Sequence, residues 1–292
     1  GRFEQRRCQV IPAAFDYVAP STVDDALRAL AAAGEDAKVL GGGQSLLPVL
    51  RVRLAAPSTV IDLGKIAELR GIREDGDTLV IGAMTTHYDV QRDPLVRAHA
   101  ALLAVATDTV ADPQIRHRGT FGGALAHADP AGDLLAPALA LDAEMVVAGP
   151  NGRRTVKAAD FFVDFFTTVL AWNEILVEVR VPKHTGWGAH YEKFNRVAQA
   201  WSIVAVAAAV RVVDGVFAEA RVGLTNMGAT PIRATSVEQA LIGRPATSAA
   251  VRAAAAHAAD GTSPITDGNS DADFRRHLAT VLTSRAVLAA AG

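Results

Sequence analysis

Two glycine-rich segments restrict the possible folds of this chain more than any other feature of its sequence. Gly41–Ser45 reads Gly-Gly-Gly-Gln-Ser, and Gly119–Gly123 reads Gly-Thr-Phe-Gly-Gly. Glycine has no Cβ atom, so consecutive backbone N–H groups can turn toward one point and form a concave nest that binds an anion. Ser45 and Thr120 add hydroxyl donors. Two such loops can hold one pyrophosphate between two subdomains, although a glycine loop alone is also typical of a simple strand-to-helix turn.

The first segment does not match either of the two common nucleotide-binding motifs. A Walker loop requires Gly-Lys-Ser or Gly-Lys-Thr, and Gly41–Ser45 contains no lysine. In the Rossmann fingerprint, Gly41 and Gly43 would be the first two glycines, and Asp62 lies about 20 residues further on, where a ribose-binding acid is expected. However, Leu46 occupies the third glycine position, which disfavours a Rossmann site.

Composition excludes several classes of protein. Half of the 292 residues are hydrophobic, but the longest run free of charged and strongly polar residues, Ile203–Val210, is far shorter than the roughly 20 residues of a membrane span. The charged start, Gly1–Cys8, lacks the apolar run of a signal peptide, which favours a cytoplasmic location, with peripheral association at the inner face of a membrane left open. A net charge of −2 without a basic block disfavours nucleic acid as a partner.

The single cysteine, Cys8, limits the metal chemistry of the chain. One thiol excludes an internal disulfide, a thiolate zinc site and an iron–sulfur cluster held by this chain alone. The eight histidines show no metal-ligand spacing, and His87, His117 and His127 are interpreted as solvent-exposed, helix-capping or supporting groups. We therefore predict no metal site, and we find no acid–base pair or triad that predicts a catalytic residue in this chain.

The pattern of helices and strands changes near residue 182. Before this point, short strands alternate with helical segments, and Asp75-Gly76 predicts a β-hairpin. After it, longer strands are expected at 189–196, 204–213 and 216–225, forming an antiparallel meander. Helices are expected at 236–242, 248–259 and 271–290. The sequence thus predicts two domains, 1–182 and 183–292.

Several ordered motifs resemble one known family, the FAD-carrying medium subunits of the molybdenum hydroxylases, which include xanthine dehydrogenase and aerobic carbon monoxide dehydrogenase. Gly41–Ser45 with the following Leu46-Leu47-Pro48 is similar to the family motif Ala-Gly-Gly-His/Gln-Ser-Leu-Leu-Pro. Gln114–Ala124 is similar to Gln-Ile-Arg-Asn-x-Gly-Thr-Ile-Gly-Gly-Asn/Ser. Further similarities cover nearly the whole chain: Arg53–Ala55, Ala126–Asp133, Tyr191–Arg196, Phe274–Arg276 and Arg285.

The resemblance implies an α+β fold. It consists of an FAD-binding domain of two α/β subdomains, the PCMH type, followed by a C-terminal antiparallel sheet with a helical bundle. Gly41–Ser45 and Thr120–Ala124 would hold the pyrophosphate, Asp129 would contact the cofactor, and Trp201 would cover the flavin ring. The complete set of expected FAD-binding residues is Leu40, Gly41, Gly42, Gly43, Gln44, Ser45, Leu46, Gly119, Thr120, Phe121, Gly122, Gly123, Ala124, Asp129, Lys193 and Trp201.

Other interpretations of individual residues stay open at this point. Trp201 is also compatible with a core aromatic residue, and Asp133 with the cap of a helix that starts near Leu134. Arg116 and Arg118 are expected on a solvated loop rather than at the phosphates. Three positions depart from the family pattern, namely Phe121, Ala124 and Ala200, and the last two lack side-chain hydrogen-bonding groups that are common in the family.

In function, the resemblance implies an FAD-carrying electron-transfer subunit, with carbon monoxide dehydrogenase as the leading expectation. Partner chains would be a large molybdenum-cofactor subunit and a small [2Fe–2S] subunit, arranged as a dimer of heterotrimers. Electrons would leave through FAD to an external acceptor such as a quinone. Three alternatives remain: a medium subunit of an N-heterocycle or aldehyde dehydrogenase, a self-contained FAD-dependent oxidoreductase of the same fold, and a non-catalytic nucleotide-binding module.

Overall fold

A small parallel sheet lies at the N-terminal end of the described chain. The computed structural model describes residues 11–292, so Cys8 lies outside the described residues. The three strands are ordered β1-β3-β2, and both neighbouring pairs are parallel. The elements of this first subdomain are β1 (Asp16–Val18), α1 (Val23–Ala33), β2 (Ala37–Leu40), α2 (Leu46–Arg51), β3 (Thr59–Asp62) and the 3₁₀ turn η1 (Ala67–Leu69). As predicted, Gly41–Ser45 follows a strand and precedes a helix.

A five-stranded sheet forms the centre of the second subdomain, and all of its neighbouring pairs are antiparallel. In spatial order its strands are β4 (Ile72–Asp75), β5 (Thr78–Gly82), β10 (Ile175–Pro182), β6 (Glu144–Gly149) and β7 (Gly152–Lys157). The hairpin predicted at Asp75-Gly76 joins β4 to β5. The sequence did not indicate β6, β7 or β10. Short apolar runs such as Met145–Ala148 do not distinguish a buried strand from a buried helix, and β7 is mostly polar and exposed.

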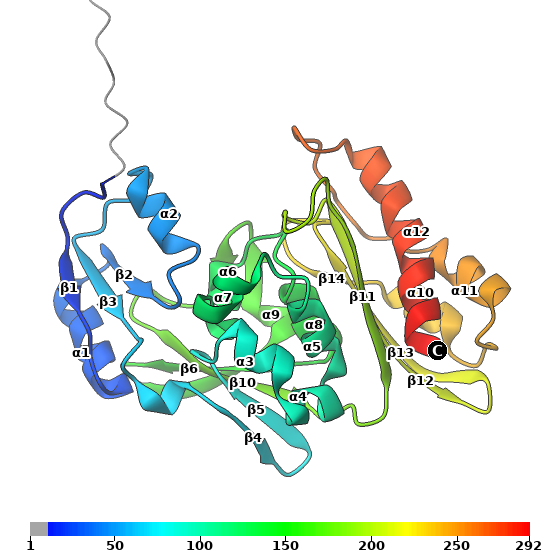
Figure 1. Ribbon diagram of the computed structural model, residues 1–292, viewed down its shortest axis with the longest axis horizontal. Coiled ribbons are helices and arrows are strands. Elements are labelled where there is room, and N and C mark those ends of the chain that lie inside the picture. The colour runs from blue at the N-terminus through cyan, green and yellow to red at the C-terminus, as the bar shows by residue number, and fades with distance from the viewer. Residues whose placement is uncertain (1–10) are drawn as a thin grey trace, which may run out of the picture.

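Seven short helices follow or interrupt this sheet. They are α3 (His87–Arg92), α4 (Pro94–His99), α5 (Ala101–Thr107), α6 (Pro113–Arg118), α7 (Phe121–His127), α8 (Leu135–Ala140) and α9 (Ala158–Phe161), and the small hairpin β8 (Phe162–Asp164) and β9 (Thr167–Thr168) comes after them. In Figure 1, α5 and α8 lie between the central sheet and the C-terminal sheet. These two helices therefore join the two halves of the molecule.

The C-terminal part is an antiparallel sheet covered on its outer face by helices (Figure 1). Its elements are β11 (Gly188–Phe194), β12 (Val204–Val213), β13 (Val216–Thr225), β14 (Ile232–Arg233), α10 (Thr235–Leu241), α11 (Ser248–Ala255) and α12 (Ala272–Ala291). The predicted meander and helical tail are confirmed. The helix predicted to end at 259 ends four residues earlier, at Ala255, and β11 ends at Phe194 rather than 196.

Strand β12 is buried on both faces, and its sequence alternates accordingly. Ala205, Ala207 and Ala209 share one buried cluster with α5 and α8, whereas Val204 and Val206 belong to the cluster of the C-terminal helices. Successive side chains of a strand point to opposite faces, so this alternation gives a small-residue face and a larger one. The alanine face lets α5 and α8 approach the C-terminal sheet closely.

The second glycine segment is not a loop throughout, and this prediction was wrong in part. Thr120 is the N-cap of α7, and its Oγ1 accepts a hydrogen bond from the Gly123 N–H at 3.2 Å. Phe121, Gly122 and Gly123 therefore form the first turn of a helix. A threonine followed by two glycines can begin a helix when tertiary contacts compensate for the low helix propensity of glycine.

Candidate cofactor site

The two glycine segments lie directly against each other. A Cβ atom placed on Gly42 would be 2.0 Å from the Arg118 carbonyl oxygen and 2.7 Å from the Gly119 Cα atom. One placed on Gly41 would be 3.2 Å from the Thr120 Oγ1 atom. Glycine is therefore required at Gly42 by the approach of two backbones, not only by the flexibility of a turn.

These segments line a large pocket together. Its volume is about 610 Å³, within the range of small-molecule and cofactor sites. Of the sixteen predicted residues, fourteen line it: Gly41, Gly42, Gly43, Gln44, Ser45, Leu46, Gly119, Thr120, Gly122, Gly123, Ala124, Asp129, Lys193 and Trp201. Leu40 and Phe121 do not. Phe121 is fully buried in the core, because its side chain leaves the first turn of α7 on the side away from the cavity.

The backbone N–H groups of the first segment are free. Among residues 11–292, the N–H groups of Gly41 to Leu46 have no protein acceptor, and Ser45 makes no side-chain capping bond to α2. Gly43 has φ +80°, a conformation that glycine adopts without strain. The first segment thus presents a run of unused donors to the cavity.

All but one of the N–H groups of the second segment, Gly119–Gly123, are already used inside the protein; the exception is Thr120, whose N–H has no acceptor among residues 11–292. Phe121 N donates to the Thr85 carbonyl at 2.9 Å, Gly122 N to the Ala83 carbonyl at 2.8 Å, and Gly123 N to Thr120 Oγ1. These bonds fasten the second segment to the turn that follows β5. The second segment shapes the cavity wall and retains one free N–H, that of Thr120, whereas Gly41–Leu46 retains all of its own.

Three cavity residues outside the glycine segments carry chemistry. Asp129 Oδ1 accepts a hydrogen bond from Ala131 N at 2.9 Å. Lys193 Nζ lies 2.7 Å from Asp133 Oδ2 and donates to the Thr109 carbonyl at 3.1 Å. Trp201 is 60% exposed, which rules out the alternative of a core aromatic and leaves its ring available to stack on a planar ligand.

Two of the open alternatives are settled by hydrogen bonds. Asp133 does not cap α8, whose first turn has no side-chain cap, and instead it lines the cavity. Arg116 donates to the Val110 and Ala111 carbonyls at 2.8 and 3.3 Å. It therefore fixes a loop of the cavity wall, and neither Arg116 nor Arg118 lines the cavity.

Sequence reasoning did not assign several cavity residues to the site, among them Lys38, His87 and Glu174. Lys38, on β2, adds a cation beside the first segment. His87 is 5% exposed, and its Nδ1 has no hydrogen-bond partner within residues 11–292. Burial, together with the charge of Arg116, lowers the pKa of His87 to about 4, so the ring is neutral at pH 7. No spacing in the sequence indicates His87, because only tertiary packing brings α3 to this cavity, whereas Lys38 lies on the strand that runs directly into Gly41.

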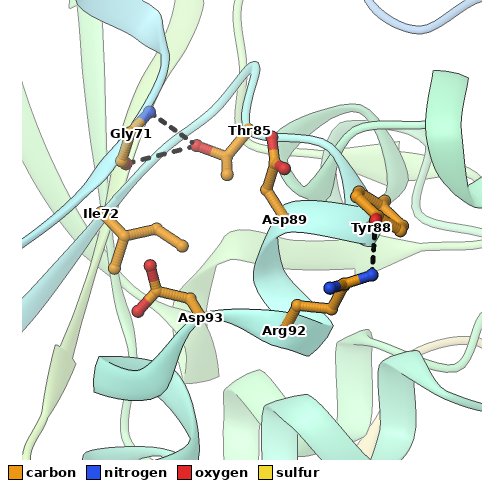
Figure 2. Close-up of a pocket in the computed structure, with 7 residues that line it drawn as sticks. All are labelled: Gly71, Ile72, Thr85, Tyr88, Asp89, Arg92 and Asp93. Carbon is orange, nitrogen blue, oxygen red and sulfur yellow. Dashed lines mark hydrogen bonds between the residues drawn. The ribbon is translucent and has the colours of Figure 1, made fainter.

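A second pocket, of about 330 Å³, lies beside α3 (Figure 2). Its polar groups bond to one another: Thr85 Oγ1 exchanges hydrogen bonds with Gly71, and Arg92 donates to the Tyr88 hydroxyl at 2.5 Å. None of the predicted site residues lines it. The described residues contain no group of three or more His, Cys, Asp or Glu arranged to hold a metal ion, and none of the helices they form has the length and apolar character that crossing a membrane requires.

The residues present fit a dinucleotide. A run of free N–H donors suits a pyrophosphate, Lys38 adds positive charge, Lys193 adds an ammonium donor that is paired with Asp133, and Trp201 offers an aromatic face. The family model described as the FAD binding domain in molybdopterin dehydrogenase matches residues 13–184, and the model of the CO dehydrogenase flavoprotein C-terminal domain matches residues 189–290. The chain belongs to the FAD-binding subunits of the molybdenum-dependent oxidoreductases.

Individual relatives agree with this membership along nearly the whole chain. The carbon monoxide dehydrogenase medium chain of Hydrogenophaga pseudoflava is 43% identical over 284 residues, covering 96% of this chain and 98% of the relative. A solved structure of carbon monoxide dehydrogenase from Hydrogenophaga pseudoflava superposes with a TM-score of 0.92 at 45% identity, covering 96% and 98%. Quinoline 2-oxidoreductase from Pseudomonas putida 86 gives a TM-score of 0.92 at 33% identity, covering 96% and 98%. The predicted α+β fold, the family and the FAD cofactor are confirmed.

Proposed function

We propose that this chain holds FAD with the unused N–H donors of Gly41–Leu46 and relays electrons within a larger oxidoreductase. The observation that carries the proposal is a run of free backbone donors on residues that line a cavity of about 610 Å³. Anions bind well where several backbone N–H groups converge, because the donors share the negative charge. Lys38 then adds positive charge, and Lys193 adds an ammonium donor that is paired with Asp133, at separate points of the cavity wall.

The remaining predicted residues have defined roles in this proposal. Trp201 lies on the segment between β11 and β12 and covers the flavin ring. Asp129 accepts hydrogen bonds from hydroxyl groups of the cofactor. Gly119 and Gly122–Ala124 form the opposite wall, and Leu40 and Phe121 support the two segments from behind. The two domains, 1–182 and 183–292, both contribute to the cavity, since Lys193 and Trp201 come from the second.

Bound FAD would supply the redox chemistry of this subunit, between the [2Fe–2S] clusters of a small partner subunit and an external acceptor such as a quinone. A large subunit with the molybdenum cofactor would oxidise the substrate, in a dimer of heterotrimers. The single cysteine supports this division, because one thiol cannot hold a cluster. It also fits the reducing cytoplasm, where we place the complex, with peripheral association at the inner face of the membrane left open.

We propose carbon monoxide as the substrate of the complex. The support is the 43% identity to a chain named as a carbon monoxide dehydrogenase medium chain. The quinoline enzyme has the same fold at 33% identity, so the fold alone does not select the substrate. Purification of the complex and reduction of a dye with carbon monoxide, quinoline or an aldehyde would decide between these substrates.

The direct test of the cofactor proposal is the flavin content of the purified chain. We expect about one FAD per chain, released by denaturation and measured by its visible absorption. A chain that stays colourless after incubation with FAD would contradict the proposal. Turnover of an organic substrate by the isolated chain, without partners, would instead favour the self-contained oxidoreductase.

A further inference from the structure

A buried group of polar side chains joins the two domains at the wall of the cofactor cavity. Asp133 comes from the first domain, between α7 and α8. Tyr191 and Lys193 come from β11, and Ser202 lies just before β12. The Lys193 ammonium lies 2.7 Å from Asp133 Oδ2, while the Tyr191 and Ser202 hydroxyls donate to Asp133 Oδ1 at 2.8 and 2.9 Å.

Both charges of this group are shielded from water. The side chain of Lys193 is 7% exposed and that of Asp133 4%. A buried ion pair is stable only when its remaining hydrogen-bonding capacity is satisfied, and here both carboxylate oxygens are bonded. Burial and the nearby carboxylate raise the pKa of Tyr191 well above its usual value, so Tyr191 remains a neutral donor.

The arrangement leaves one donor of Lys193 unused. An ammonium group has three N–H donors. Of the acceptors in residues 11–292, only Asp133 Oδ2 and the Thr109 carbonyl bond to Nζ, at 2.7 and 3.1 Å. Because Lys193 also lines the cavity, the remaining donor is available to a ligand there.

The spacing of Tyr191 and Lys193 along β11 explains why both side chains reach Asp133. Tyr191 and Lys193 are two residues apart on one strand, so both side chains point to the same face, toward Asp133. The intervening Glu192 points to the other face, where it bonds to His190. The two side chains of β11 that face Asp133 are therefore the Tyr191 phenol and the Lys193 ammonium, and the Glu192 carboxylate points away from it.

We propose that Asp133 is a positioning residue that holds the Lys193 ammonium at the cavity wall, so that its third N–H donates to bound FAD. This inference rests on the proposed function, because it requires FAD in this cavity. Asp133 acts through Lys193, whereas Lys193 itself touches the cofactor.

The proposal makes a distinctive prediction for the charge variants. Lys193→Met removes the cation and should lower the midpoint potential of bound FAD, because reduction adds negative charge that the ammonium stabilises. Asp133→Asn should also lower the potential, because Lys193 then loses its anchor at the wall. Both variants should raise the dissociation constant of FAD about tenfold or more, as expected for the loss of a charge-assisted hydrogen bond.

The experiment uses the full chain reconstituted with FAD, with dissociation constants from fluorescence titration and potentials from spectroelectrochemistry. Tyr191→Phe is the matched control: it removes one hydrogen bond from Asp133 but keeps both charges, and it should leave the potential unchanged. If Asp133→Asn raises the potential or leaves it unchanged, Lys193 stays in place without the carboxylate and the proposal is wrong.

A double variant keeps the test valid if a single charge variant fails to fold. Removing one member of a buried ion pair leaves an unpaired charge, but Asp133→Asn with Lys193→Met leaves none. We expect the double variant to bind FAD no more weakly than Lys193→Met alone, because Asp133 acts through Lys193. Wild-type affinity and potential in the double variant would overturn the proposal. A wild-type chain that binds no FAD would instead contradict the proposed function.

Discussion

The two glycine segments look alike in the sequence but differ in what their backbones do. In Gly41–Leu46, the N–H groups have no acceptor among residues 11–292. In Phe121–Ala124, every N–H group is bonded, to Thr85, Ala83 or Thr120. The first segment therefore retains donors for a ligand, whereas most donors of the second hold it to its neighbours. A glycine-rich motif identifies a place where backbones come close, but only its hydrogen bonds show whether it retains donors for a ligand.

Substituting a glycine at the contact between the two segments should have the largest effect. In Gly42→Ala, the new methyl would lie 2.0 Å from the Arg118 carbonyl oxygen, so the segments must separate. We expect a loss of about 4 kcal/mol in the free energy of unfolding, measured by urea denaturation, and loss of FAD binding. Gly268→Ala is the control, because a Cβ atom there meets nothing within 4 Å. Wild-type stability and FAD binding in Gly42→Ala would show that the segments do not need this contact.

Acid should weaken the second segment through His87. His87 N donates to the Gly119 carbonyl at 3.0 Å, and its pKa is lowered to about 4 by burial and by Arg116. The unfolded chain binds a proton near pH 6.5, whereas the folded chain binds it only near pH 4. The free energy of unfolding should therefore fall by on the order of 3 kcal/mol as the pH drops from about 6.5 to 4. Above about pH 6.5, His87 should cause no change of stability with pH.

A histidine substitution isolates this contribution. His87→Gln should flatten the acid-side loss of stability, measured by thermal unfolding between pH 4 and 7. His257→Gln should leave it in place, because the His257 side chain is 54% exposed. An unchanged pH profile in His87→Gln would show that other groups cause the acid sensitivity.

Two variants that remove hydroxyl groups should separate FAD affinity from folding stability, with smaller effects than the substitutions above. Thr120→Ala removes the cap that accepts from Gly123 N and should cost about 1 kcal/mol of stability. Ser45→Ala should change stability by less than about 0.5 kcal/mol, because Ser45 makes no side-chain capping bond, but should weaken FAD binding about tenfold. Thermal unfolding and FAD titration measure both properties. The reverse pattern, with Ser45 governing stability and Thr120 only affinity, would contradict the assigned roles.

Much of this architecture could be predicted from sequence, for identifiable physical reasons. The Asp75-Gly76 hairpin, the long strands after residue 182 and the C-terminal helices carry strong local signals, and all are confirmed. Strands β6 and β10 were not predicted because they are largely buried, which removes the polar alternation that identifies a strand. Strand β7 was not predicted because its residues are mostly polar and exposed, so it has no apolar alternation either. Fourteen of the sixteen predicted cofactor residues line the cavity because they belong to contiguous motifs.

The parts that could not be predicted depend on contacts between distant segments. His87 reaches the cavity only through tertiary packing, and Asp133 was indistinguishable from a helix cap until Tyr191 and Lys193 were placed beside it. The two glycine segments could be told apart only from the hydrogen bonds that the second one donates to the Ala83 and Thr85 carbonyls. No sequence motif specifies these bonds.

Amide hydrogen exchange in the apo and FAD-loaded chain tests the central claim most directly. Free N–H groups exchange rapidly, and groups that bond to a ligand become protected. We expect peptides covering Gly41–Leu46 to exchange rapidly without FAD and to gain strong protection with it, while Phe121–Ala124 should already be protected and change little. Unaltered exchange at Gly41–Leu46 in a chain that demonstrably binds FAD would contradict the claim that this segment provides the donors.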